Sequence, residues 1–356
     1  MSKQTIAIIF GGKSSEYFVS LESSYSVLSH IDQNKFDIYM IGISQDGKWK
    51  HFIGNIEKIK ENTWDSEKLP SVSICLDSTQ QALLEIKNHQ VQYIHVDAIF
   101  PILHGLNGED GSVQGAIQLS HIPLIGCDVL SSSLCMDKYR AHQLVEKNGI
   151  AVPRSIFIEN QKDYKLKREN ILALNLPLYI KPIHAGSSLG ISKIHSFEQL
   201  DQAVAKSFEY DHEIVVEEEI KGFEVGCAVM GIDQLTVGRV DEIELSHGFF
   251  DFEEKYSLKT SKIHMPARID AQLEKQIQET AKQIYKILGC RVFARVDMFL
   301  TPDHTIVFNE INTIPGFTAH SRYPNMMKGI QLDFQQLLTN LIEIGINDAN
   351  NRINTK

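Results

Sequence analysis

Strand-like and helix-like segments alternate along this 356-residue chain from its start, and this alternation restricts the fold more than any other feature. Ile6–Phe10 is an apolar, β-branched run that ends in two glycines, and residues 16–30 then carry apolar side chains at helical spacing. Such alternation is typical of an α/β fold with a largely parallel sheet. Further strands are expected at 36–43, 98–103 and 123–125, with a short helix at 111–119.

The rest of the chain continues the alternation and divides into further units. The first unit ends near residue 133, and a helix expected at 138–148 is stopped by Gly149. Because 356 residues exceed one ordinary domain, two or three packed units are expected. The sequence then predicts strands at 155–158, 178–182 and 214–218, a β-rich stretch at 226–250, and helices at 197–208, 271–288 and 334–344, the last stopped by Gly345.

Composition and charge exclude several classes of protein. The hydrophobic content of 43% and the charged content of 22% are those of a folded soluble chain. A net charge of −10 argues against nucleic acids or anionic membranes as general partners, although a local basic pocket stays open. The longest apolar runs are only strand-length, no signal-peptide core follows Met1, and the five scattered cysteines lack CxxC spacing. We therefore expect a cytoplasmic protein without disulfides or structural zinc.

Two apolar runs near the C-terminus flank the turn sequence Thr301-Pro-Asp303 and predict a β-hairpin. Symmetric closure about this turn places Asp297 opposite Glu310 and Arg295 opposite Asn312. Side chains two residues apart share a strand face, so all four side chains are expected on one patch. Two carboxylates and an amide oxygen form an all-oxygen site that suits Mg²⁺. The alternative is a solvated strand face with a cross-strand ion pair.

Two glycine-rich loops follow predicted strands. The turn from Gly11 to Glu16 lies where α/β sheets bind ligands, but it is not a P-loop, because Ala7 stands where that motif requires glycine. Glu16 either complements the helix dipole or receives the ammonium group of a ligand. His104 opens the second loop, whose glycines allow close backbone approach, and this histidine is either structural or in contact with a ligand.

Isolated lysines and a Gly/Ser loop indicate an anion site. Lys181 ends an apolar strand, and the loop 186–190 offers backbone N–H groups together with the hydroxyls of Ser187 and Ser188. Lys138 is a second candidate lysine. Either lysine alone is explained equally well by a solvated head group, but their joint occurrence favours a phosphate site.

An acidic and an aromatic stretch complete the candidate residues. Residues 217–220 resemble an inter-domain strand whose polar edge reads an adenine, and Glu224 is placed to hold ribose hydroxyls; alternatively these acids face solvent. Residues 249–256 are dense in aromatic side chains and predict either a lid that excludes water or a partly buried loop.

Taken together and in this order, these motifs resemble the ATP-grasp D-alanine–D-alanine ligase family, especially the vancomycin-resistance subgroup of the G type that joins D-alanine to D-serine. The resemblance covers nearly the whole chain and is carried by the long runs Cys135–Lys138, Gly222–Val229, Gly238–Ser246, Asn309–Phe317 and Ser321–Met327. It implies an α/β fold, α+β in its ATP-grasp part, with a Rossmann-like N-terminal substrate domain at 1–133, a central ATP-grasp subdomain at 134–225, and a C-terminal subdomain with the metal site and lid at 226–350.

The resemblance also implies cofactors, partners and residue roles. ATP and two Mg²⁺ ions, for which Mn²⁺ can substitute, serve the small substrates D-alanine and D-serine in a homodimer. The implied ATP-binding residues are Lys138, Lys181, Ser188, Glu217, Glu218, Glu219, Ile220, Glu224, Phe250, Lys255, Asn309 and Glu310, and the metal ligands are Asp297, Glu310 and Asn312. The implied catalytic groups are Glu16, Ser187, Tyr256, Arg295 and Ser321, and the substrate contacts are Glu16, His104, Asp241, Arg295, Gly316, Ser321 and Arg322.

By this resemblance, the carboxylate of the first substrate attacks the γ-phosphate to give an acyl phosphate, and the amine of the second substrate then attacks the acyl carbon. Arg295 is expected to meet the developing oxyanion rather than to pair with Asp297. Because acyl phosphates hydrolyse, the lid must exclude water before the chemistry begins.

Arg322 directly follows Ser321, where ordinary D-alanine ligases tend to carry an apolar residue. A guanidinium in the acceptor pocket can hydrogen-bond a hydroxymethyl group but is left unpaired against a methyl group. Asp241 is the expected partner that orients Arg322. The alternative is that Arg322 points to solvent or to a neighbouring carboxylate.

One residue departs from the family pattern. His184 stands where relatives usually have arginine, two residues before Gly186. Imidazole titrates near neutrality, so His184 is expected to lower phosphate affinity or to make it pH-dependent. We predict that His184→Arg lowers the KM for ATP.

The sequence therefore predicts an ATP-dependent D-alanine–D-serine ligase of peptidoglycan precursor synthesis, with roles in cell-wall biogenesis, cell shape and vancomycin resistance. A housekeeping D-alanine–D-alanine ligase is the alternative enzyme. A catalytically inactive nucleotide-binding sensor is the alternative outside enzymes.

Overall fold

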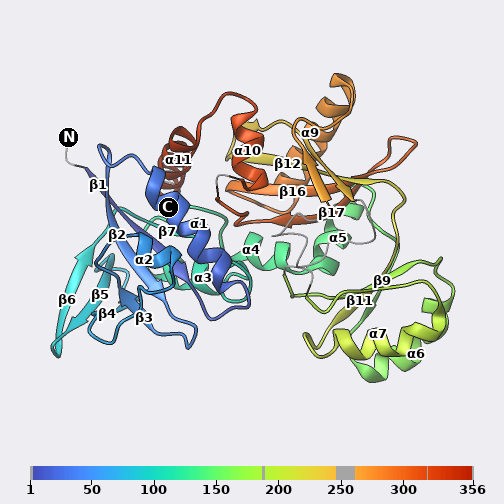
Figure 1. Ribbon diagram of the computed structural model, residues 1–356, viewed down its shortest axis with the longest axis horizontal. Coiled ribbons are helices and arrows are strands. Elements are labelled where there is room, and N and C mark those ends of the chain that lie inside the picture. The colour runs from blue at the N-terminus through green and yellow to red at the C-terminus, as the bar shows by residue number, and fades with distance from the viewer. Residues whose placement is uncertain (1–2, 187–188, 246–260, 319, 355–356) are drawn as a thin grey trace.

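The computed structural model describes residues 3–186, 189–245, 261–318 and 320–354. Three β-sheets, each packed against helices, lie beside one another in this part of the chain (Figure 1). The N-terminal sheet lies at one end of the molecule, and the two sheets of the middle and C-terminal segments lie at the other. The fold is thus a mixed α/β arrangement, as the alternating sequence pattern predicts.

The N-terminal sheet has seven strands in the order β6-β5-β4-β3-β2-β1-β7. Strand β1 (Gln4–Gly11), next to the edge strand, pairs in parallel with its two neighbours, and every other pair is antiparallel. The other elements are α1 (Tyr17–His30), β2 (Phe36–Ile43), β3 (Trp49–His51), α2 (Glu57–Lys60), β4 (Ser71–Ile74), β5 (Ala82–Lys87), β6 (Gln90–His95), β7 (Ala98–Pro101) and α3 (Ser112–Ser120).

The prediction of a largely parallel sheet is therefore wrong for this sheet, in which two strand pairs are parallel and four are antiparallel. Strands β5 and β6 form a hairpin about Asn88 and His89, which both have positive φ angles, as a tight two-residue turn requires. The strands around this hairpin contain no apolar run longer than the three residues Ala82–Leu84, so the sequence pattern did not reveal them. The strand predicted at 123–125 is reduced to a single bridge between Ile99 and Leu124.

The middle segment forms a four-stranded antiparallel sheet in the order β10-β9-β11-β8. Helices α6 and α7 cover one face of this sheet and bury an apolar cluster that includes Ile180, Leu200 and Val216 (Figure 1). The elements are α4 (Val129–Met136), α5 (Lys138–Lys147), β8 (Ser155–Ile158), α6 (Gln161–Leu172), β9 (Leu178–Pro182), β10 (Ser192–Ile194), the 3-10 helix η1 (Phe197–Gln199), α7 (Leu200–Ser207) and β11 (Ile214–Glu218).

The C-terminal segment forms a third sheet in the order β15-β14-β12-β16-β17, with β13 paired to β12. Helix α9 begins at an N-cap, Asp270, whose side chain accepts from the backbone of Leu273, and it buries an apolar stripe against this sheet. The elements are β12 (Phe223–Gly231), β13 (Leu235–Val237), β14 (Asp241–Leu245), β15 (Ser261–His264), α9 (Ala271–Ile287), β16 (Val292–Leu300), β17 (Ile306–Asn312), α10 (Arg322–Lys328) and α11 (Phe334–Asn354).

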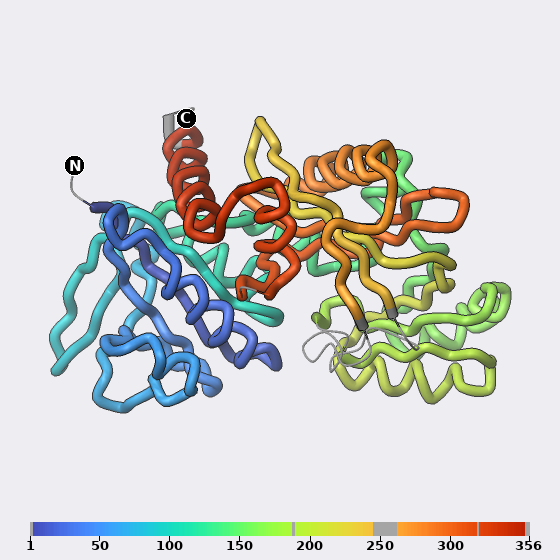
Figure 2. Tube along the Cα trace, turned by 45° about the horizontal axis from the view of Figure 1, so that its top comes forward, coloured from blue at the N-terminus to red at the C-terminus, as the bar shows by residue number. Residues whose placement is uncertain are grey.

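Helix α11 returns the chain to the N-terminal unit. It packs against α1, β7 and β16, and Figure 2 shows this red helix beside the blue N-terminal segments. Ile6, Phe293 and Leu338 accordingly belong to one apolar core. The predicted stop at Gly345 is wrong, because the helix continues to Asn354. Gly345 instead allows close packing, since a Cβ atom there would lie 3.0 Å from Ile125.

Glycine packing gives a test of the N-terminal core. A Cβ atom at Gly42 would overlap the buried ring of Trp64, whereas one at Gly115 in α3 would lie 3.8 Å from its nearest neighbour, on Val129. We expect Gly42→Ala to lower the free energy of unfolding by about 1–3 kcal/mol. Gly115→Ala is expected to raise it by about 0.5–1 kcal/mol, because alanine favours a helix.

Urea denaturation of both variants measures the difference. Equal stability of Gly42→Ala and the unmodified protein would show that the Trp64 ring can move aside, which contradicts tight packing at this position.

Candidate active site

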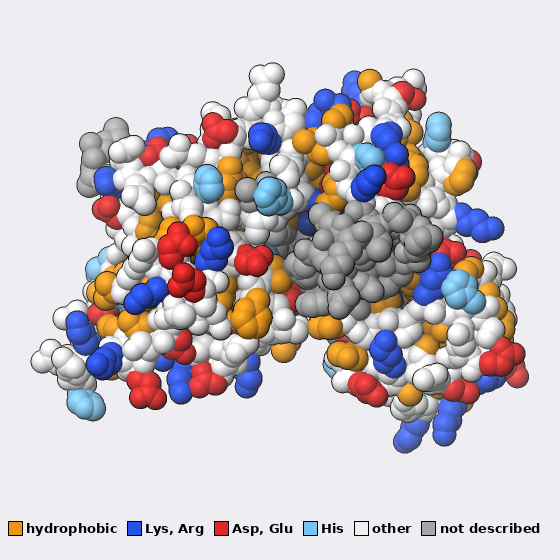
Figure 3. Space-filling view, viewed as in Figure 1, with side chains coloured by type: hydrophobic (Ala, Val, Ile, Leu, Met, Phe, Trp, Pro, Cys, Tyr) orange, Lys and Arg blue, Asp and Glu red, His pale blue; other side chains and the backbone are white. Residues whose placement is uncertain are grey.

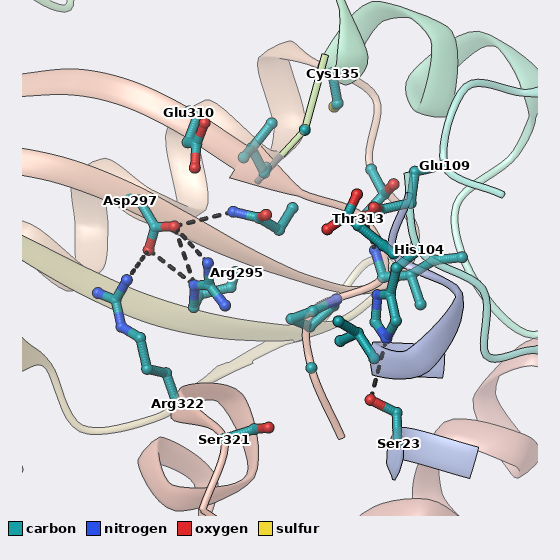
Figure 4. A pocket seen from close by; sticks show the side chains of 18 of the residues that line it. Ser23, His104, Glu109, Cys135, Arg295, Asp297, Glu310, Thr313, Ser321 and Arg322 are labelled. Carbon is teal, nitrogen blue, oxygen red and sulfur yellow. Dashed lines mark hydrogen bonds and ion pairs between the residues drawn. The ribbon is translucent and has the colours of Figure 1, made fainter. Parts of the chain in front are cut away.

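A pocket of about 270 Å³ is enclosed by all three units. Helix α1, the loop after β7, strands β16 and β17 and the start of α10 supply its walls (Figure 4). It brings together many of the polar residues singled out in the sequence, namely Glu16, His104, Lys138, Gly186, Glu224, Arg295, Asp297, Glu310, Asn312, Gly316, Ser321 and Arg322.

The hairpin of β16 and β17 has the register predicted from its turn. Asp297 faces Glu310 and Arg295 faces Asn312 across β16 and β17, with an irregularity after Asp297. The row continues across the sheet, because Asp297 pairs with Gly226 of β12 and Gly226 pairs with Asp241 of β14. Three acidic residues and a glycine therefore lie in line across four strands.

Arg295 makes an ion pair with Asp297 that the sequence analysis did not expect. Its Nε donates to both carboxylate oxygens, at 2.9 and 3.1 Å, and its Nη2 donates to Oδ2 at 2.7 Å. The amide of Asn312 also donates to Oδ2, at 2.9 Å. The expectation that Arg295 does not pair with Asp297 is therefore wrong for this structure: the two side chains share a strand face, and the buried carboxylate needs a counter-charge.

Arg322 lies at the start of α10, beside Asp297 (Figure 4), and contacts three carboxylates. Its Nε and Nη2 donate to the two oxygens of Asp241, each at 2.8 Å, which confirms Asp241 as its partner. Its Nη1 donates to Glu224 at 2.9 Å and lies 3.2 Å from Oδ1 of Asp297. Gly226 leaves room for this guanidinium, because a Cβ atom there would overlap Arg322.

The residues around Asp297 fit a divalent cation. Asp297, Glu310 and Asn312 provide the oxygen ligands that Mg²⁺ prefers, and Glu310 lines the same pocket (Figure 4). The two arginines Arg295 and Arg322 pair with the three carboxylates of Asp241, Glu224 and Asp297, so these carboxylates outnumber the arginines. A bound cation would offset that excess.

Glu16 also lines the pocket and lies against two glycines. A Cβ atom on Gly105 would overlap the Glu16 carboxylate, and one on Gly186 would lie 2.8 Å from its Oε2. The His104 ring lies behind this group and contacts the Ser23 hydroxyl through Nε2 at 3.1 Å (Figure 4). Burial lowers the pKa of His104, which favours a neutral ring at physiological pH.

Glu109 is a site residue that the sequence analysis missed. Its carboxylate accepts from the backbone N–H of Gly105 at 2.8 Å and of Ile314 at 3.2 Å, so it joins the His104 loop to the loop that carries Gly316. Burial and the nearby carboxylate of Glu16 raise the pKa of Glu109 to about 8. The signal in the sequence is its position among glycines, five residues after His104.

The loop before α10 forms part of the pocket wall. The hydroxyl of Ser321 accepts from the backbone N–H of Thr318 at 3.0 Å and contacts the Thr318 hydroxyl at 2.8 Å. Gly316 lies beside it, since a Cβ atom there would lie 2.8 Å from Oγ of Ser321. Ser321, Gly316 and Arg322 thus gather as the sequence predicts.

The predicted phosphate lysines are both engaged by the protein. Lys181 pairs with Glu217 at 2.6 Å; burial opposes its charge, but the neighbouring carboxylate outweighs this and the pKa of Lys181 is raised. Lys138 donates to the backbone carbonyls of Ile183 at 3.3 Å and Ala185 at 2.7 Å, and so holds the segment that leads to Gly186.

Glu217 has unused hydrogen-bonding capacity deep in the fold. Its buried Oε1 and the Nδ1 of His142 lack hydrogen-bond partners among the described residues, although they lie 3.5 Å apart. Nε2 of His142 contacts the carbonyl of Asn309 at 2.6 Å. Unsatisfied acceptors fit a ligand rich in N–H donors, such as an adenine with its amino group.

Three of the other predicted nucleotide residues, Glu218, Glu219 and Glu224, contact groups other than Glu217. Glu218 accepts from the backbone N–H of Asn175 at 2.9 Å. This agrees with the alternation of side chains along a strand, which puts Glu218 on the opposite face of the sheet from Glu217. Glu219 pairs with Lys193 at 2.5 Å. Ile220 is half-buried, and the carboxylate of Glu224 contacts Arg322 rather than solvent.

Five predicted site residues lie outside the part of the chain that the structure describes, namely Ser187, Ser188, Phe250, Lys255 and Tyr256.

His184, two residues before Gly186, is stabilised as a cation by its neighbours. Its ring nitrogens face Asp137 at 3.4 Å and Asp211 at 2.9 Å, and these carboxylates raise the pKa of His184 to about 9. Arg140 and Glu213 complete the cluster. The expectation that His184 titrates near neutrality is wrong, because two acids stabilise its charged form. The predicted effect of His184→Arg on the KM for ATP stays a prediction.

Acidic and basic side chains are interspersed on the face shown in Figure 3. Among the described residues, the helices include none that is long and apolar enough to cross a membrane.

Comparison with known proteins connects this geometry to a family. The D-ala D-ala ligase N-terminus model matches residues 5–127, and the D-ala D-ala ligase C-terminus model matches residues 144–343. The vancomycin B-type resistance protein VanB of Enterococcus faecalis is 42% identical over 351 residues, covering 97% of this chain and 99% of VanB. A D-alanine–D-alanine ligase of Caldicellulosiruptor bescii is 38% identical over 353 residues, covering 97% and 96%.

Solved structures agree with these matches. The crystal structure of VanG D-Ala:D-Ser ligase from Enterococcus faecalis has a TM-score of 0.90 at 56% identity and covers 97% of this chain and 100% of that one. The D-alanine–D-alanine ligase from Coxiella burnetii has a TM-score of 0.86 at 27% identity, covering 100% and 97%. The fold and site define an ADP-forming ATP-grasp ligase. The chain belongs to the D-alanine–D-alanine ligase family.

The His184 cluster gives a pH-dependent stability. The pKa of His184 is about 9 in the folded protein against an ordinary value of 6.5, so its ion pairs stabilise the fold fully below pH 6.5. This contribution is lost as the pH rises from 6.5 through about 9. We expect the urea midpoint of the unmodified protein to fall over this window more than that of His184→Arg, which stays charged.

Urea titrations at a series of pH values test this expectation, with Arg168→Lys as a control substitution at an exposed arginine. Parallel pH profiles for the unmodified protein and His184→Arg would contradict a titrating cation at His184.

Proposed function

We propose that this protein ligates D-alanine to D-serine at the expense of ATP, through a D-alanyl phosphate. The observation that carries the proposal is the guanidinium of Arg322, held by Asp241 beside Ser321 in the lining of the pocket. Similarity to VanG D-Ala:D-Ser ligase over nearly the whole chain supports it.

The groups that line the pocket suit such a reaction. Glu16 lines it, and its carboxylate can receive the ammonium of D-alanine. Arg322 and Ser321 line it as well and can bind the acceptor. Asp297, Glu310 and Lys138 belong to the same lining. Different residues are thus proposed to serve the donor amino acid, the phosphate and the acceptor.

The residues support the chemistry by position and charge. A carboxylate becomes a good electrophile only after phosphorylation, and phosphoryl transfer depends mainly on alignment and charge neutralisation. When bound at Asp297, Glu310 and Asn312, Mg²⁺ would neutralise phosphate charge. Lys138 and Lys181 supply fixed positive charge nearby. Arg295 lines the pocket, and its guanidinium would stabilise an oxyanion once its pairing with Asp297 loosens.

Acceptor choice follows from hydrogen bonding. A hydroxymethyl group can accept from Arg322, whereas a methyl group would leave a buried donor unpaired, and such sites discriminate strongly. The housekeeping alternative treats Arg322 as a purely structural ion-pair residue, for which its three carboxylate contacts are an argument.

Wider assignments belong to the same proposal. We infer an N-terminal Rossmann-like substrate domain at 1–133, ATP-grasp subdomains at 134–225 and 226–350, and a two-Mg²⁺ site with Mn²⁺ as a substitute. A homodimer in the cytoplasm would make peptidoglycan precursors that bind vancomycin poorly, in keeping with similarity to vancomycin resistance proteins.

Product analysis tests the proposal. With ATP, D-alanine and D-serine together, we expect the mixed dipeptide to dominate and Arg322→Met to lower the ratio of mixed dipeptide to D-alanyl-D-alanine by about tenfold or more. Because methionine leaves Asp241 buried without its counter-charge, the double variant Arg322→Met with Asp241→Asn should show the same change.

Arg268→Met is the matched control, because this arginine pairs with Glu242 away from the pocket and should leave the product ratio unchanged. Dominant D-alanyl-D-alanine from the unmodified protein would favour the housekeeping ligase. No ADP with any amino-acid pair would favour a nucleotide-binding sensor.

A further inference from the structure

We propose that Arg322 couples the metal site to the choice of acceptor, so that D-serine is preferred over D-alanine only when metal and nucleotide are bound. The inference rests on the proposed function, because it takes Arg322 as the residue that meets the acceptor. It adds that the guanidinium of Arg322 belongs to both the metal site and the acceptor site. Binding at the metal site would make its Nη1 available to the acceptor.

The contacts of Arg322 divide into two sets. Nε and Nη2 form a two-bond pair with the fully buried Asp241, each bond 2.8 Å long. Nη1 instead contacts Glu224 at 2.9 Å and Asp297 at 3.2 Å. A terminal guanidinium nitrogen carries two hydrogens; Nη1 donates to Glu224, and Asp297 lies within ion-pair distance of the same nitrogen.

The two partners of Nη1 are the residues that a nucleotide and a metal ion would claim. Asp297 belongs to the all-oxygen set with Glu310 and Asn312, and Glu224 is the predicted ribose contact. A cation bound at Asp297 would repel a guanidinium at 3.2 Å and would take the oxygen that Nη1 now contacts. Binding at the metal and nucleotide sites therefore frees the hydrogens of Nη1.

The rest of the guanidinium is fixed in place. Asp241 holds it by two parallel bonds, a geometry that restricts rotation. Gly226 leaves room for it in this row of the sheet, and a Cβ atom there would also lie 2.8 Å from Met326. Arg322 therefore stays beside Asp241 when its Nη1 partners are taken, and only the Nη1 arm changes its bonding.

A freed Nη1 would donate into the same pocket that Ser321 lines. Arg322 and Ser321 both line it, and Arg322 is 9% exposed, so its freed donors have little access to bulk water. A serine hydroxyl can accept from such a donor, whereas an alanine methyl leaves it unsatisfied. Before metal binds, Nη1 is already satisfied, so the pocket gains little from the hydroxyl.

Thermodynamic linkage makes this inference measurable without turnover. If metal strengthens D-serine binding, D-serine must strengthen metal binding by the same factor. D-alanine, which offers no acceptor to Nη1, should have a much smaller effect. The prediction concerns a difference between two ligands that differ only by a hydroxyl group.

The experiment measures Mn²⁺ affinity by electron paramagnetic resonance of free Mn²⁺, with the full-length protein saturated with ADP. We expect saturating D-serine to lower the Mn²⁺ Kd by about fivefold or more, and D-alanine to change it by less than about twofold. Equal effects of D-serine and D-alanine would overturn the coupling.

Arg322→Lys provides a second arm, since lysine keeps a positive charge near Asp241 but has no separate Nη1 arm. We expect this variant to bind Mn²⁺ more tightly without amino acid, because the competitor at Asp297 is gone, and to lose the D-serine effect. Arg268→Lys is the matched control and should retain that effect. If Arg322→Lys does not fold, the Mn²⁺ Kd values of the unmodified protein with D-serine and with D-alanine still test the coupling.

The coupling and the proposed function fail in different ways. If the dipeptide assay detects no D-alanyl-D-serine, the proposed function fails and the coupling falls with it. If D-serine is ligated but leaves the Mn²⁺ Kd unchanged, the coupling alone is overturned.

Discussion

The buried carboxylate of Asp297 is the group on which the rest of the site depends. It is 1% exposed and accepts from Arg295 and Asn312 while Arg322 lies 3.2 Å away. A buried charge of this kind is tolerated only when it is paired, and breaking such pairing costs about 3–5 kcal/mol. The arginines that satisfy Asp297 are also the groups proposed to meet the oxyanion and the acceptor, so folding and function use the same contacts.

Sheet register explains why these groups meet. Asp241, Gly226, Asp297 and Glu310 lie in one row because β14, β12, β16 and β17 are neighbours. The pairing of Asp297 with Glu310 could be predicted from the turn at Thr301–Asp303 and from the alternation of side chains along a strand. The position of Asp241 in the same row could not, because it depends on a sheet order that places strands distant in sequence beside one another. The Arg295–Asp297 ion pair was missed because the sequence does not show how deeply a carboxylate is buried.

The fold was predictable where apolar runs are long and misleading where they are short. Strands β2, β8, β9 and β11 occupy the predicted residues. The short strands β5 and β6, in contrast, were not predicted, and they form a hairpin that adds antiparallel strands to the first sheet. Gly345 had the sequence signal of a helix end but provides close packing against Ile125 instead. His184 shows the same limit for chemistry, since its charge is fixed by Asp137 and Asp211, which lie on other elements.

A crystal structure with ADP, Mg²⁺ and a D-serine-containing phosphinate dipeptide tests the central claim most directly. The account predicts that Nη1 of Arg322 lies about 3 Å from the serine hydroxyl. It also predicts that Asp297 and Glu224 have exchanged their contacts with Nη1 for metal and nucleotide, while Asp241 keeps both of its bonds. A structure in which Nη1 still contacts Glu224 and Asp297, with the serine hydroxyl bound elsewhere, would contradict it.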